Sequence, residues 1–355
     1  MKYGIRNIAG PACCIALLSI YLLACSDDDD KTATVTTLAG TGAEGHIDGS
    51  GATAKFNSPS GVAADAQGNV YVTDFQNCSI RKITASGEVS SLAGKLDPGY
   101  IDATGELAKF YGPNGVAVDQ DGNLYIADEG NHRIRKVTPA GEVTTFAGSG
   151  VMGYADGKGN EAQFHSPSGI TIDTDGNLYI ADQGNNCIRK ITPGKIVTTL
   201  AGNGEADYKD GAGDNARFYR PTGVAADVDG NIYVADLFNH RIRKITAAGV
   251  VSTVAGIGVM GYANGSADEA KFRYPAGLAL DAQGNIYVAD SENQCIRKID
   301  KNGTVSTLAG SSEGFGDGAL GVALFRYPRE IEIDAQGNMY IADAGNNRIR
   351  KITNF

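Results

Sequence analysis

The sequence of 355 residues has no tryptophan and only four histidines, four methionines and ten prolines. It also lacks long runs of helical periodicity, and its β-branched residues and tyrosines lie between 48 glycines, a pattern typical of short strands joined by tight turns. A positive charge excess is missing too, because 31 Lys and Arg face 41 Asp and Glu, a formal net charge of −10. The composition therefore predicts an all-β protein and argues against nucleic acid as a partner.

The N-terminal segment has the pattern of a targeting signal. Two basic residues precede an apolar run over residues 8–23, and the run ends in "LLAC" at Cys25. This resembles the lipobox of bacterial lipoproteins, which implies cleavage before Cys25 and lipidation of its thiol. A short transmembrane anchor is the alternative, although the run is below the ~20 residues needed to span a bilayer.

The stretch "SDDDDK" that follows resembles the acidic tether of surface-displayed lipoproteins. We therefore predict a signal peptide at 1–24, a lipidated tether at 25–32 and a folded domain at 33–355. Multiple acyl chains hold a protein on a membrane where one chain would not. The expected location is the cell envelope, as an outer-membrane lipoprotein that faces outward.

A unit of about 54 residues recurs six times. The recurring proline is spaced by 54 residues four times and then by 53. It stands at Pro59, Pro113, Pro167, Pro221, Pro275 and Pro328.

Each unit divides into four predicted strands, which in the second unit cover residues 115–119, 123–128, 132–137 and 142–148. The first two strands are nearly continuous apolar runs, so both faces of the sheet should be buried. A ring of sheets gives every unit a neighbour on each side. We therefore predict a six-bladed β-propeller of four-stranded antiparallel blades.

The N-terminal strand should close this ring. The sixth unit stops after its third strand, and the missing fourth strand is "ATVTTLAG" at 33–40, which matches "GTVSTLAG" at 303–310. Pairing of the two ends in the last blade would remove the open sheet edges.

The pattern "GVAVD..GNLYIAD.GNHRIRKV" resembles the NHL repeat, and six copies resemble a six-bladed NHL β-propeller. Relatives in that family include an amidating lyase, RNA-binding domains, kinase sensor domains and adhesion proteins, so the resemblance implies the fold but no single function. The zinc-binding histidines of the lyase have no counterpart here, because no histidine falls in an innermost strand.

Most features that repeat in every unit should belong to the scaffold. The arginines of the "IRK" triplets and the aspartates that end the second strands are expected to pair, and the "DxDGN" stretches are expected to be hairpin turns. His132 and His240 lie in non-adjacent units, too far apart to share a metal ion. Cys78, Cys187 and Cys295 lie in alternate units, so we expect free, mostly buried thiols. The aromatic or histidine side chain in each long connection, such as Tyr208, is predicted mainly to anchor the loop.

A candidate site lies where the units agree in backbone but differ in side chain. Each unit contains Phe-x-x-Pro just before its innermost strand, and the two middle residues vary. Rings and guanidinium groups at the channel mouth could stack on sugars or bind carboxylates and sulfates, whereas blade-edge packing is the alternative. The candidate ligand-binding residues are Tyr111, His165, Tyr219, Arg220, Arg273, Tyr274, Arg326, Tyr327 and Arg329.

The sixth innermost strand breaks the symmetry. It reads "PREIEID", which places Arg329, Glu330 and Glu332 where the other strands carry smaller residues. Two carboxylates at the channel wall are costly unless they are hydrated, paired or bound to a ligand. A metal or acid–base site is one interpretation, and salt bridges to neighbouring arginines are the other.

Two classes of function follow. The first is an envelope-anchored, monomeric binding module without a cofactor, which holds an extracellular glycan or protein partner through its loop-bearing face. The second is a hydrolase or lyase that uses Glu330 and Glu332 as catalytic residues with calcium or another divalent ion in the channel. We favour the first class because no nucleophile–base constellation is present.

Overall fold

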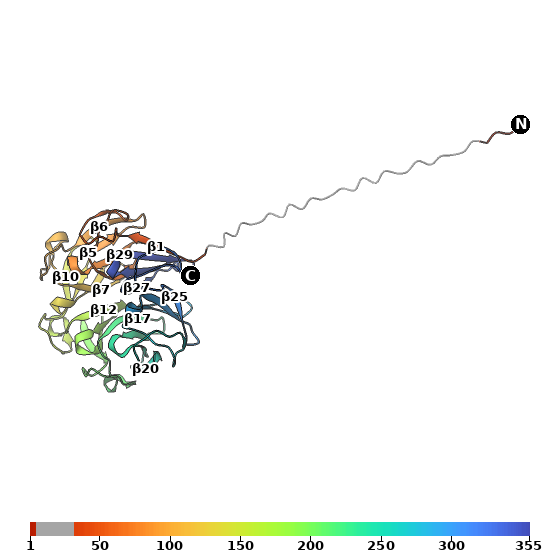
Figure 1. Ribbon diagram of the computed structural model, residues 1–355. Helices are drawn as coiled ribbons and strands as arrows, with labels where there is room; N and C mark the ends of the chain where they lie inside the picture. Colours follow the sequence, from red (N-terminus) through yellow and green to blue (C-terminus); the bar gives the residue numbers. More distant parts are fainter. Residues whose placement is uncertain (5–31) are drawn as a thin grey trace. The chain divides into compact units, whose positions relative to one another are not determined.

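The computed structural model describes residues 1–4 and 32–355. Cys25, the apolar run and the acidic stretch therefore lie outside the described residues. Residues 32–355 form one compact unit of six antiparallel sheets, which surround a central channel as the blades of a propeller. Figure 1 shows the innermost strands β7, β12, β17 and β27 around the middle of this unit.

The strands of each blade are given from the channel outward. The innermost strands are β3 (Pro59–Ala64), β7 (Pro113–Val118), β12 (Pro167–Ile172), β17 (Pro221–Ala226), β22 (Pro275–Leu280) and β27 (Pro328–Ile333). The second strands are β4 (Val70–Asp74), β8 (Leu124–Asp128), β13 (Leu178–Asp182), β18 (Ile232–Asp236), β23 (Ile286–Asp290) and β28 (Met339–Asp343). The third strands are β5 (Ser79–Ile83), β9 (Arg133–Val137), β14 (Cys187–Ile191), β19 (Arg241–Ile245), β24 (Cys295–Ile299) and β29 (Arg348–Thr353). The fourth strands are β6 (Glu88–Ala93), β10 (Val143–Ala147), β15 (Ile196–Ala201), β20 (Val250–Ala255), β25 (Thr304–Ala309) and β1 (Thr34–Ala39).

Five of the six sheets gain a two-residue fifth strand from the long connection. Only the second blade has the predicted four strands and no more. These short strands are β2 (Gly49–Ser50), β11 (Gly157–Lys158), β16 (Gly211–Ala212), β21 (Gly265–Ser266) and β26 (Gly318–Ala319). In the second blade the equivalent position makes only an isolated bridge between Thr104 and Glu142.

Short 3-10 helical turns lie after the second strands and in some of the connections. One follows each second strand: η1 (Phe75–Asn77), η3 (Glu129–Asn131), η5 (Gln183–Asn185), η7 (Leu237–Asn239), η8 (Ser291–Asn293) and η9 (Ala344–Asn346). Three more lie in the connections: η2 (Gly105–Leu107), η4 (Gly159–Glu161) and η6 (Gly213–Asn215). None of the helical segments among residues 1–4 and 32–355 has the length and apolar character of a membrane span.

The ring closes as the sequence predicts. β1 pairs antiparallel with β29, with Thr34 opposite Thr353 and Val35 opposite Ile352. The same strand pairs with β26 on its other edge. Both edges of the N-terminal strand are therefore hydrogen-bonded within the last blade, and no terminal blade is left with an open fourth position.

The core fills the wedges between blades. The second strands are buried along nearly their whole length, and the phenylalanine of each Phe-x-x-Pro is fully buried. These rings therefore belong to the core. The three cysteines among the described residues, Cys78, Cys187 and Cys295, are free and buried, as predicted.

The "DxDGN" stretches are hairpin turns. In the second blade the Asp119 carboxylate accepts the Asn123 backbone N–H at 2.8 Å and its side-chain amide at 2.9 Å. The carboxylate is thus occupied in closing the turn between β7 and β8, as the sequence predicts.

Candidate functional site

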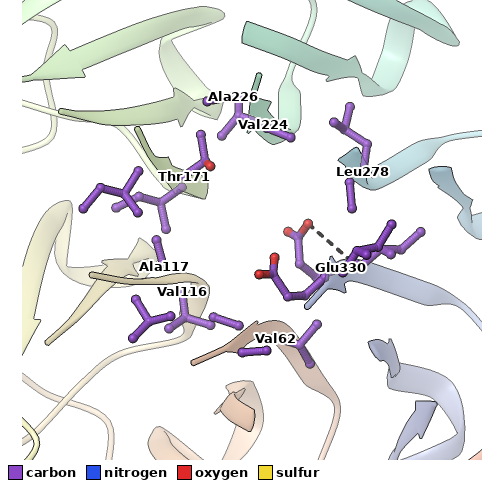
Figure 2. Close-up of a pocket in the computed structure, with 18 of the residues that line it drawn as sticks. Val62, Val116, Ala117, Thr171, Val224, Ala226, Leu278 and Glu330 are labelled. Atoms are coloured by element: carbon purple, nitrogen blue, oxygen red, sulfur yellow. Dashed lines mark hydrogen bonds between the residues drawn. The ribbon is translucent and has the colours of Figure 1, made fainter. Parts of the chain in front are cut away.

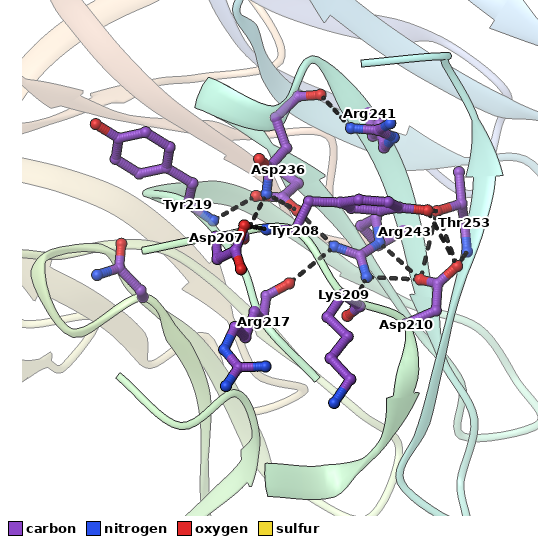
Figure 3. Close-up of polar contacts among 12 residues, drawn as sticks. Asp207, Tyr208, Lys209, Asp210, Arg217, Tyr219, Asp236, Arg241, Arg243 and Thr253 are labelled. Atoms are coloured by element: carbon purple, nitrogen blue, oxygen red, sulfur yellow. Dashed lines mark hydrogen bonds and ion pairs between the residues drawn. The ribbon is translucent and has the colours of Figure 1, made fainter. Parts of the chain in front are cut away.

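A buried arginine forms the centre of every blade, and Arg243 shows the arrangement (Figure 3). Its Nη1 donates to Asp236 at 2.6 Å, and its Nη2 donates to Asp210 at 2.6 Å. The same guanidinium also donates to the backbone carbonyls of Arg217 and Lys209. One cation therefore joins the third strand, the end of the second strand and the incoming connection.

Two aromatic rings enclose this guanidinium. The Arg243 Cζ lies 5.0 Å from the Phe218 ring centroid and 4.8 Å from that of Tyr208. The Tyr208 ring belongs to the long connection, so its predicted role as a loop anchor is confirmed. The buried arginines with the same pairing to a second-strand aspartate are Arg81, Arg135, Arg189, Arg297 and Arg350.

The aspartate of this pair also positions the candidate site. Asp236 Oδ1 accepts the backbone N–H of Tyr219 at 2.8 Å, while its Oδ2 accepts from Arg243 and from Asn239. The same bond holds the first variable residue in every blade, so Asn57, Tyr111, His165, Arg273 and Arg326 donate to their own second-strand aspartates. The Asp–Arg pair therefore fixes the backbone from which the variable side chains project.

The second variable residue is held by the preceding blade. His240 Nδ1 accepts the backbone N–H of Tyr274 at 3.3 Å, and His132 Nδ1 accepts that of Ser166 at 3.1 Å. Burial lowers the pKa of both histidines, which favours the neutral ring that this acceptor role requires. Asn347, Asn186 and Gln294 supply the acceptor in other blades. These contacts between blades were not foreseen from the sequence.

This second residue has a left-handed backbone, and that conformation decides which side chains reach the channel mouth. Its φ is 49° at Arg220, 51° at Tyr274 and 48° at Tyr327. These three side chains, together with Arg329 from β27, line a cavity of about 590 Å³ at the mouth. They are four of the nine predicted ligand-binding residues.

The other five predicted residues do not line this cavity. Tyr219 stacks on Phe238 with ring centroids 5.0 Å apart, and Arg273 and Arg326 pair with Glu292 and Glu313 at 2.9 Å. The remaining two, Tyr111 and His165, lie over the turns after the second strands, close to Gly130 and Gly184. The first variable residue does not have the left-handed backbone of the second.

The structure adds residues that the sequence analysis missed. One set follows the second-strand aspartate, and the other follows the repeated proline. In the cavity wall the first set supplies Phe75, Glu129, Gln183, Leu237 and Ser291. The second supplies Ser60, Asn114, Ser168, Thr222 and Ala276 beside Arg329. The residue type at these two positions varies between the units, and this variation in the sequence could have revealed both sets.

The cavity continues into the channel at Glu330, which lines both spaces. The channel space measures about 310 Å³ and is lined mainly by small and aliphatic side chains of the innermost strands. Figure 2 shows the Glu330 carboxylate directed toward the interior of this ring. Small residues are needed here, since a Cβ at Gly223 would lie 2.5 Å from the Ala276 carbonyl oxygen.

Glu330 and Glu332 face the channel as predicted, but their expected salt bridges are wrong. Among the described residues neither carboxylate has a cationic partner within 4.0 Å, and no His, Cys, Asp or Glu groups with them as a third metal ligand. Burial raises the pKa of Glu330 to about 8, with a smaller contribution from the Glu332 carboxylate. Burial likewise raises the pKa of Glu332 to about 8.

Stability should depend on this pair at high pH. Folding raises the pKa of Glu330 from an ordinary 4.5 to about 8, so its ionisation opposes folding progressively above pH 4.5 and fully above pH 8. We expect Glu330→Gln to stabilise the full chain at pH 9 by about 1–2 kcal/mol, allowing for screening at the open channel. At pH 4.5 the variant and the parent should unfold alike.

Urea unfolding at the two pH values measures this difference. Glu142→Gln, at an exposed hairpin between β9 and β10, is the control and should behave alike at both. A Glu330→Gln variant with equal stability to the parent at pH 9 would contradict the raised pKa.

Comparison with known proteins finds the same repeat and the same fold elsewhere. The NHL repeat family model matches residues 56–83, 110–137, 164–191, 218–245 and 272–299. The chain is 32% identical over 287 residues to the protein SUPPRESSOR OF QUENCHING 1 of Arabidopsis thaliana. That match covers 76% of this chain and 27% of the plant protein, so the chain spans about a quarter of its relative's length.

Two solved structures from Bacteroides thetaiotaomicron share the fold. A protein of unknown function superposes with a TM-score of 0.70 at 25% identity and covers 90% of this chain and 76% of its own. A protein described as an auxiliary nutrient binding protein superposes with a TM-score of 0.69 at 18% identity, with the same coverage. The chain is therefore a six-bladed β-propeller, and five of its six units match the NHL repeat.

Proposed function

We propose that the chain is a binding module whose ligand occupies the cavity at the mouth of the channel. One observation carries the proposal: a backbone repeated six times presents side chains that differ from blade to blade, and these side chains converge on one concavity. A volume of about 590 Å³ lies in the range of small-molecule sites. The scaffold is thus constant, and the chemistry is concentrated where the blades differ.

A glycan suits this cavity better than a protein partner. Tyr274 and Tyr327 offer ring faces for sugar stacking, and Gln183 and Ser291 offer an amide NH2 group and a hydroxyl for the sugar hydroxyl groups. The concave shape would take the end of a saccharide, whereas protein interfaces are usually broad. The Bacteroides protein described as nutrient binding shares only the fold with this chain, and extending a binding role from it is part of the proposal.

We also propose that the propeller works at the cell surface as an outer-membrane lipoprotein anchored through Cys25. The support is the basic, apolar and "LLAC" sequence followed by an acidic stretch. Propeller and tether together would hold a saccharide-binding cavity outside the cell.

Replacing Cys25 tests the anchor. The full chain should incorporate labelled palmitate and sediment with the membranes, whereas Cys25→Ala should lose the label because the acylated thiol is gone. Cys78→Ala, which removes a buried thiol of the propeller, is the control and should keep the label. Equal labelling of Cys25→Ala and the parent would refute lipidation at this residue.

Removal of one ring at the mouth tests the binding site. We expect Tyr327→Ala to weaken glycan binding by about tenfold, because its exposed ring lines the cavity. Tyr111→Ala removes an exposed ring outside the cavity and should bind as the parent does. A glycan array followed by titration calorimetry measures both.

Two outcomes would contradict the proposal. Glycan binding that survives in Tyr327→Ala but fails in Tyr111→Ala would move the site to the outer loops. Binding of a protein and of no glycan would replace the ligand class.

A further inference from the structure

We infer that the ligand of the mouth cavity is an acidic saccharide, and that its oxyanion, a carboxylate or a sulfate ester, binds between Arg220 and Arg329. This inference rests on the proposed function and specifies the ligand class. It is carried by two guanidinium groups that line one cavity and lack an anionic partner.

Arg329 lies in the cavity wall with few contacts of its own. It is the only cation at the position that follows the repeated proline, where other blades carry Ser60, Asn114, Ser168, Thr222 and Ala276. The guanidinium lies over the Phe75 ring, 5.6 Å from its centroid. Its single hydrogen bond to a described residue is a long one, 3.5 Å to the Ser60 hydroxyl. Most of its N–H donors therefore remain available to a ligand.

Arg220 reaches the same cavity from the fourth blade. Its guanidinium lies 5.6 Å from the centroid of the Phe238 ring. It donates to the side-chain oxygen of Gln183 at 3.1 Å, and its backbone N–H is fixed by Asn186 at 2.9 Å. Each of the two guanidinium groups thus lies on an aromatic ring that limits its orientation, as suits a planar group that binds oxyanions through paired N–H donors.

The guanidinium groups of the other arginines among the described residues have carboxylate or backbone carbonyl acceptors within the protein. The six buried arginines and Arg217, Arg273 and Arg326 all pair with carboxylates. Arg133, Arg241 and Arg348 each donate to two backbone carbonyls. In the part of the chain that the structure describes, Arg220 and Arg329 alone have neither type of acceptor. In a chain with ten more acidic than basic residues, this exception points to an external anion.

The acidic groups around the cavity leave this positive charge largely uncompensated. Glu292 is paired with Arg273, and Glu330 stays mostly protonated at neutral pH because burial raises its pKa to about 8. Glu129 accepts a hydrogen bond from Asn114 at 2.8 Å, and burial raises its pKa too. Two cations therefore face the one carboxyl of Glu129, so the local field favours an anion although the whole chain is acidic.

Titration calorimetry with matched saccharides tests the inference on the full chain. The probes are a galacturonic acid trimer, its methyl ester and a sulfated galactose trimer. The ester keeps the sugar rings and removes the charge. We expect an acidic trimer to bind about 10- to 100-fold more tightly than the ester, and the preference to shrink in high salt. The acidic probe that binds more tightly identifies carboxylate or sulfate as the oxyanion.

Substitutions then locate the oxyanion. Arg329→Gln and Arg220→Gln should each lose most of the preference for the acidic trimer and keep the affinity for the ester. Arg326→Gln is the matched control, because Arg326 lies three residues from Arg329 but pairs with Glu313 outside the cavity. Its preference should stay unchanged, and thermal unfolding of each variant confirms that it folds.

Three results would overturn the inference. They are equal affinity for acid and ester, a preference that survives both cavity substitutions, and no binding of any probe. Equal affinities that remain sensitive to Tyr327→Ala would leave the proposed function standing. If no probe binds, the glycan array decides whether the proposed function stands.

Discussion

Each blade depends on one buried arginine that must find acceptors for its N–H donors away from water. Burying an unpaired guanidinium would be prohibitive, so the chain supplies two carboxylates and two backbone carbonyls, as Arg243 shows with Asp236 and Asp210. In the fifth blade the amide oxygen of Asn264 replaces the second carboxylate. These acceptors come from the second strand and from the connection that enters the blade. The hydrogen bonds to the cation therefore fix the loop. The other oxygen of the second-strand aspartate accepts the backbone N–H of the first variable residue and fixes that residue too.

The same constraint explains how a symmetric scaffold carries an asymmetric site. The pairing of arginine with aspartate repeats in all six blades, so side chains at the mouth can change without loss of the fold. Contacts between blades, such as that of His240 with Tyr274, hold the left-handed residue that projects into the cavity. The cations and rings that distinguish this protein thus lie on positions whose backbone is already determined, which favours binding without rearrangement.

Much of the fold could be predicted from the sequence, because repetition makes periodic features visible. The six blades, the closure through β1 and the pairing of arginines with aspartates all follow from residues that recur at fixed spacing. The site was only partly predictable. Spacing does not show that Arg220 has φ of 49° while its neighbour Tyr219 does not, and this difference decides which side chain enters the cavity. Likewise Glu129 and Phe75 reach the mouth through the turn after the second strand, which only the folded backbone reveals.

Amide hydrogen exchange in Arg243→Met, compared with Lys244→Met, tests most directly whether the buried cation positions the mouth. Lys244 follows Arg243 on β19, but its ammonium group lies over the Tyr233 ring of β18, so its loss should leave the loop in place. We expect the amides of residues 207–219 to exchange at least about tenfold faster in Arg243→Met, since one charge-assisted hydrogen bond alone contributes about 1.5–3 kcal/mol. The strand amides of the other five blades should keep their protection. Exchange of residues 207–219 at the parent's rate in Arg243→Met would contradict the account.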